Sequence, residues 1–162
     1  MIEYEFNNQM SLLAKEYGLS FDNDYSAVRL PKVLESTLRE GIQELHEGQK
    51  VYYMIKSQAF CNHIYPNKFE FFYEDLTGNE ASNNKVIFEI GRYKRYALKK
   101  GILFCHKLYD ILPDSHEFCI IMGVDENYVT ISFHMVRDGE SWLGNDLEAY
   151  KLEAILVMNV KR

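Results

Sequence analysis

Apolar residues recur at helical spacing in the first third of the chain. Phe6, Met10, Leu13 and Tyr17 follow one another at intervals of three and four residues. This spacing predicts an amphipathic helix, and Gly18 is a suitable residue to end it. A second helix is predicted to begin near Pro31 and to end at Gly48. Its apolar stripe comprises Leu30, Leu34, Leu38, Ile42 and Leu45.

Shorter apolar runs separated by polar turns follow this helical part. Strands are predicted at residues 68–74, 86–90, 102–108, 118–124, 128–136 and 154–160. The polar, glycine-containing stretch 76–84 predicts a loop, and Asp125-Glu126-Asn127 predicts a short hairpin connection. Two stretches stay open: Val51–Ile55 fits a strand or a helical continuation, and 92–100 fits a short helix ending at Gly101 or a basic edge strand.

These elements predict an α+β fold with N-terminal helices packed on an antiparallel sheet of five or six strands. The length of 162 residues suits one domain, 1–162, in which 1–48 is mainly helical and 51–162 is mainly antiparallel sheet. No apolar run is long enough to span a bilayer, and the acidic start lacks the features of a secretion signal. We therefore expect a cytoplasmic protein that does not bind membranes.

The net charge of −6 changes the picture because it is unevenly distributed. Residues 92–107 carry six cations and no acid, so the rest of the chain sums to −12. An acidic chain is a poor general nucleic-acid binder, and we expect no direct nucleic-acid contact. The basic segment is usually a solvated face, although a regulator linked to nucleic acid through Arg92 to Lys107 stays an alternative.

Motifs for catalysis and metal binding are missing from the sequence. The three cysteines do not form a disulfide framework; Cys105 and Cys119 are expected in the core. No zinc-ligand spacing, nucleophile elbow or phosphate loop occurs, so no catalytic residue, metal or cofactor is predicted. Ser132 and His134 share a predicted strand face and are expected to point to solvent. Glu70 and Glu74 are expected on one strand face and solvated.

The segment 137–153 stands out as a long connection before the last strand. It carries a net charge of −3 and contains the only tryptophan, Trp142. Twelve tyrosines also exceed what a core of this size needs, and surface aromatic residues are good interface material. One interpretation is a partner-binding loop; the other is that Trp142 and Leu143 close the core. The predicted partner-binding residues are Asp138, Glu140, Trp142, Asp146, Glu148 and Tyr150.

The residues from 118 to 160 resemble a known family. The strand end ISFHMVRDGE is followed by SWLGNDLEAYKLE and a final EAILV strand. This order resembles the small bacterial immunity proteins of contact-dependent growth inhibition and other polymorphic toxin systems. The resemblance implies a non-enzymatic protein that binds a cognate toxin C-terminal domain, often a nuclease, and blocks its active site or substrate access. Free, it would be a monomer or homodimer. The alternative is a small cytosolic enzyme that uses Cys61 or the acidic loop 138–148.

Overall fold

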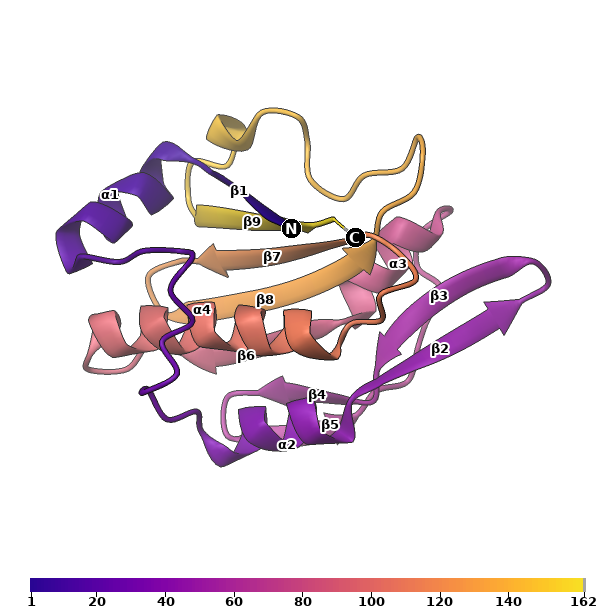
Figure 1. Cartoon of the computed structure of the whole chain (residues 1–162), viewed down its shortest axis with the longest axis horizontal. Helices are drawn as coiled ribbons and strands as arrows, with labels where there is room; N and C mark the ends of the chain where they lie inside the picture. Colours follow the sequence, from indigo (N-terminus) through magenta and orange to yellow (C-terminus); the bar gives the residue numbers. More distant parts are fainter. Residues whose placement is uncertain (162) are drawn as a thin grey trace.

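The computed structural model describes residues 1–161 and is built on a seven-stranded sheet in the order β1-β9-β7-β8-β6-β4-β5 (Figure 1). The strands are β1 (Ile2–Phe6), β4 (Ser57–Phe60), β5 (His63–Pro66), β6 (Lys85–Glu89), β7 (Phe118–Val124), β8 (Tyr128–Met135) and β9 (Ala154–Val160). Neighbouring strands of this sheet pair antiparallel, except for the pair β4–β6, which is parallel. The predicted α+β class with a mostly antiparallel sheet is confirmed.

The predicted strand number of five or six is wrong for this sheet, which has seven strands. The strands β1, β4 and β5, which were not predicted, lie toward the two edges of the sheet. Every residue of β5 is exposed, so β5 lacks the alternation of apolar and polar positions that indicates a half-buried strand. The central strands, by contrast, were predicted within one residue: 118–124, 128–136 and 154–160.

Helix α1 (Asn8–Tyr17) confirms the first predicted helix. The Asn7 side chain caps it by accepting a hydrogen bond from the Met10 N–H at 3.0 Å, and Gly18 ends it at a φ of 62°. Phe6, which we expected on this helix, lies instead on β1.

Helix α2 (Lys32–Glu40) begins after Pro31 as predicted but ends before Gly41 rather than at Gly48. Gly41 has a φ of 80°, and this positive angle ends the helix because helical residues have negative φ values. Glycine suits the position because other residues rarely adopt a positive φ. The rest of the predicted helix forms β2 (Ile42–Glu47), which pairs with β3 (Lys50–Ile55) in a separate two-stranded sheet. The open stretch Val51–Ile55 is therefore a strand.

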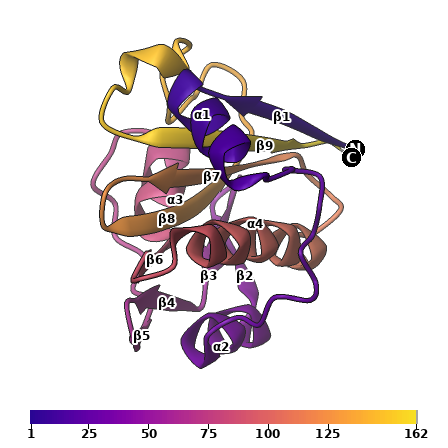
Figure 2. The ribbon, with the colours of Figure 1, turned by 90° about the vertical axis from the view of Figure 1, so that its left-hand side faces the viewer.

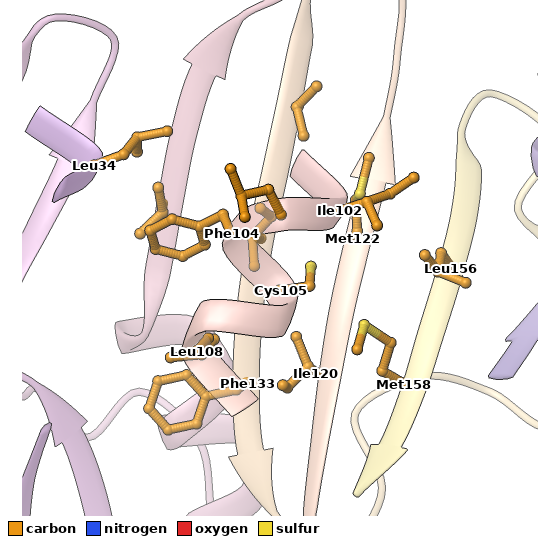
Figure 3. Packing of buried hydrophobic residues seen from close by; sticks show 14 of the residues in the cluster. Leu34, Ile102, Phe104, Cys105, Leu108, Ile120, Met122, Phe133, Leu156 and Met158 are labelled. Carbon is orange, nitrogen blue, oxygen red and sulfur yellow. The ribbon is translucent and has the colours of Figure 1, made fainter. Parts of the chain in front are cut away.

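Helix α4 (Lys94–Ile111) lies along β7 and β8 and covers one face of the main sheet (Figures 1 and 2). Its buried side chains meet alternate residues of β7, such as Ile120 and Met122, in the main core (Figure 3). Cys105 belongs to this core, as expected. The other face of β7 presents Cys119 and Ile121, so β7 is buried on both sides.

The strand predicted at 102–108 is wrong, because these residues form the middle of α4. Residues 102–105 are an unbroken apolar run, and a buried helix segment and a buried strand give the same pattern at that length. The helical alternative for 92–100 holds, but the helix continues past Gly101. There the missing side chain lets the helix approach the sheet: a Cβ on Gly101 would lie 2.7 Å from Met122 Cε.

Helix α3 (Leu76–Asn83) replaces the loop predicted at 76–84. Its sequence LTGNEASN has weak helix formers, but the Asp75 side chain caps its first turn and most of its side chains are buried. The strand predicted at 68–74 is also wrong, because 67–72 has no strand assignment and 73–75 forms a bend. Glu70 and Glu74 are exposed as expected, although on irregular backbone.

Helices and strands are interleaved along the chain, since β1 precedes α1 and α4 lies between β6 and β7. A search of residues 1–161 finds no helix with the length and apolarity to cross a bilayer.

Candidate protein-binding surface

The connection 136–153 covers the face of the main sheet opposite α4. Trp142, Leu143, Leu147 and Tyr150 pack on a small second core formed by Cys119, Ile121, Ile155 and Val157. A short 3-10 helix, η1 (Leu147–Ala149), lies within this connection. The interpretation that Trp142 and Leu143 close the core is confirmed, and Trp142 is only partly buried there.

Two of the four acids predicted to bind a partner hold the loop to the rest of the molecule, and a third acts within the loop. Glu140 Oε2 accepts a hydrogen bond from the Thr77 N–H of α3 at 3.0 Å, and Glu148 Oε1 accepts from the Asn8 N–H of α1 at 2.7 Å. Asp146 Oδ1 accepts from the Glu148 N–H at 3.0 Å and caps η1. Carboxylates at helix N-termini satisfy N–H groups that have no partner within the helix. These three acids therefore have structural roles.

The other predicted partner-binding residues are Tyr150, which bonds within the loop, and Asp138 and Trp142, which keep exposed surface. The Tyr150 hydroxyl accepts a hydrogen bond from the Gly144 N–H at 2.9 Å, inside the loop. Asp138 is exposed and stays available to a partner. Trp142 makes an edge-to-face contact with Tyr73, with ring centroids 5.2 Å apart, and the Lys85 ammonium lies 6.0 Å from the indole centroid. Trp142 is thus in contact with segment 67–75, which sequence reasoning had not connected to it.

A buried ion pair joins the connection 136–153 to α3 and the β2–β3 hairpin. The Glu80 carboxylate, fully buried, is bonded to the Arg137 guanidinium and accepts from the Tyr53 N–H at 2.9 Å. Arg137 Nη2 in turn donates to the Val51 carbonyl at 3.0 Å. Burial acts to raise the pKa of Glu80, while Arg137 acts to lower it. With every polar group satisfied, the pair fixes where β8 ends and the loop begins.

The asparagines of α3 hold the extended segment 67–75 in place. The Asn79 side chain accepts from the Phe72 and Tyr73 N–H groups at 2.8 and 2.9 Å and donates to the Tyr73 carbonyl at 3.0 Å. Asn83 pairs in the same way with both backbone groups of Glu70, at 2.9 and 2.7 Å. Each amide thus replaces the neighbouring strand that this backbone lacks.

The three consecutive rings on this fixed backbone are largely exposed, although Phe71 also packs against Tyr52 and Tyr73 against Trp142. Phe71, Phe72 and Tyr73 are 52%, 68% and 47% exposed. We call Phe71, Phe72, Tyr73 and Trp142 the aromatic surface. The run of three aromatic residues is the signal that the sequence contains, because consecutive residues of an extended segment cannot all face one core.

The groups around the aromatic surface are mainly acidic. Glu70, Glu74 and Asp138 are exposed on the segments that carry it, and Lys68 and Lys85 are the nearby cations. Exposed aromatic rings beside exposed carboxylates suit a protein interface with a basic partner.

The cysteines are poorly suited to nucleophilic chemistry. Cys119 lies directly opposite His134 on β8 and Asn159 on β9. Burial raises the pKa of Cys119 to about 12, so the thiol is protonated. Desolvation, followed by the charge of Glu89, also raises the pKa of Cys61. These shifts oppose what the alternative of a cysteine-dependent enzyme requires.

The expectation that Ser132 and His134 face solvent is wrong, because the loop covers that face of β8. Ser132 and His134 are 5% and 6% exposed. His134 Nδ1 bonds the carbonyl of Met135 at 3.0 Å, and burial lowers its pKa. Within residues 1–161, no three His, Cys, Asp or Glu side chains are grouped closely enough to hold a metal ion.

A comparison with models of protein families identifies the family of this chain. The family model described as "Uncharacterized protein PM0498 family" matches residues 5–162. The chain belongs to the PM0498 family. The match includes all helices, every strand of the main sheet except the first part of β1, and the aromatic surface. No curated protein and no solved structure matches the chain.

Proposed function

We propose that this PM0498-family chain is a cytoplasmic, non-enzymatic immunity protein that binds and neutralises a cognate toxin domain, and that the aromatic surface is its docking site. The observation that carries the proposal is the exposure of Phe71, Phe72 and Tyr73 on backbone that α3 holds rigid. The resemblance of residues 118–160 to immunity proteins supplies the class of partner.

Rigid aromatic side chains bind proteins efficiently. Tyrosine, tryptophan and phenylalanine bury a large area with few rotatable bonds, so they dominate the energy of many interfaces. Asn79 and Asn83 have already ordered the backbone beneath the rings, which removes part of the entropy that binding would otherwise cost.

The partner we propose is a basic protein, most naturally a nuclease domain. Nucleases present positive surfaces to the phosphate backbone. Glu70, Glu74 and Asp138 would attract such a surface and speed the encounter. Binding there would block the toxin's active site or its access to substrate.

A rescue assay tests this proposal. The chain is co-expressed with the toxin C-terminal domain encoded immediately upstream of its gene, growth is measured, and the two proteins are co-purified. We expect restored growth and a one-to-one complex. Phe72→Ala should weaken the complex at least tenfold, as loss of an aromatic hot spot does.

Leu12→Ala on α1 is the matched control, because Leu12 is 66% exposed and Phe72 is 68% exposed. Both variants should unfold at the temperature of the wild type. A toxic neighbour that the chain fails to neutralise would reject immunity function. Rescue that Phe72→Ala and Leu12→Ala leave equally intact would reject the aromatic surface as the docking site.

A further inference from the structure

A cavity separate from the aromatic surface lies where the parallel strands β4 and β6 end. Within residues 1–161 these two strands form the only parallel pair of the main sheet. Cys61 follows β4, and Ile90 to Tyr93 connect β6 to α4. This cavity, of about 340 Å³, lies between these connections. Crevices at the carboxyl ends of parallel strands are preferred ligand sites in open sheets.

The cavity is cationic in an otherwise acidic chain. Arg92 and Lys100 line it, and neither forms an ion pair with any carboxylate of residues 1–161. Lys94, Arg95 and Lys99 lie on the same part of α4. Glu89 is the one carboxylate in the lining. Two of the six cations of residues 92–107 thus line a cavity.

The walls of the cavity are aromatic. Tyr93 and Tyr96 line it with 63% and 57% of their surface exposed, and the buried Phe88 lies beneath. The guanidinium of Arg92 lies 5.7 Å from the Tyr93 ring centroid. Exposed rings beside unpaired cations suit a ligand that is planar at one end and anionic at the other.

We propose that this cavity binds a small phosphate-bearing ligand with a planar ring, of the mononucleotide class. Arg92 and Lys100 contact the phosphate, and the ring stacks on Tyr93 or Tyr96. The volume of about 340 Å³ admits a ligand of that size. The cavity is formed by other residues than the aromatic surface, so this proposal is independent of the proposed function.

Calorimetric titration of the full chain with each of the four common ribonucleoside 5′-monophosphates tests the proposal. We expect at least one to bind with a Kd below about 1 mM, and inorganic phosphate and the matching nucleoside to bind at least about tenfold more weakly. Lys100→Ala and Tyr96→Ala should each weaken binding about tenfold. Lys107→Ala, on the same helix but outside the cavity lining, should leave the affinity unchanged.

Three outcomes would overturn the assignment. One is that no monophosphate binds below 1 mM. Another is that the nucleotide binds no more tightly than inorganic phosphate, which would leave an anion site without a ring site. The third is that Lys100→Ala and Tyr96→Ala bind as the wild type does. Thermal unfolding of each variant, expected near the wild-type temperature because both side chains are at least partly exposed, excludes a folding defect.

Discussion

At the scale of single residues, the buried His134 makes the free energy of unfolding depend on pH. Its pKa lies below the ordinary value of about 6.5, because burial disfavours the imidazolium ion. Below pH 6.5 the unfolded chain therefore takes up a proton that the folded chain refuses. The free energy of unfolding should fall as pH drops from 6.5 toward the lowered pKa, by at most about 1.4 kcal/mol per unit.

Urea unfolding of the wild type and of His134→Gln at pH 7.5 and 5.5 measures this contribution. We expect the stability advantage of the wild type over the variant to shrink at pH 5.5, because glutamine does not titrate. An advantage of the same size at both pH values would contradict the role of His134.

Also at this scale, the sequence did not indicate the hydrogen bonds that the acids of segment 137–153 make within the protein. The acids Glu140, Asp146 and Glu148 were predicted to face a partner, yet each accepts a backbone N–H of its own chain. A carboxylate in a loop gives the same sequence pattern whether it meets solvent, a partner or a helix end. Only the three-dimensional position of α1 and α3 decides between these roles.

At the scale of elements, α4 depends on the absence of a side chain at Gly101. A Cβ there would meet Met122 and Val129, both almost fully buried. Gly101→Val should lower the free energy of unfolding by roughly 2–3 kcal/mol, because the added methyl groups have no room against the sheet. Denaturant unfolding provides the measurement.

The control is Lys107→Val, at an exposed position of the same helix. It introduces the same poor helix former without the clash, and we expect a loss of no more than about 1 kcal/mol. Because valine is a better helix former than glycine, a loss at Gly101→Val no larger than that at Lys107→Val would contradict the packing role of Gly101.

Elements with strong periodicity were predictable, and those held by specific contacts were not. The hairpin 118–136, the strand 154–160 and helix α1 follow from alternating or helical spacing. Helix α3 does not, because it depends on asparagine amides that bind the backbone of residues 53–55 and 70–73. Such contacts join segments that are distant in sequence, so no local pattern indicates them.

At the scale of the whole molecule, charge distribution predicts how association responds to salt. The rate of association with a basic toxin domain should fall as ionic strength rises, because salt screens attraction between exposed charges. The double variant Glu74→Gln, Asp138→Asn should flatten this dependence, whereas Glu16→Gln on α1 should not. Stopped-flow measurements over a salt series provide the test. A rate that is independent of salt would remove electrostatic steering from the proposal.

The pairing of β1 with β9 also governs how the protein is made. β1 leaves the ribosome long before β9, which is its one neighbour in the sheet within residues 1–161, through Ile2 opposite Val160 and Phe6 opposite Leu156. At typical rates of translation, β1 therefore waits on the order of ten seconds for a partner. During synthesis the nascent chain exposes an unpaired strand, and folding of this sheet is completed only after translation has passed β9.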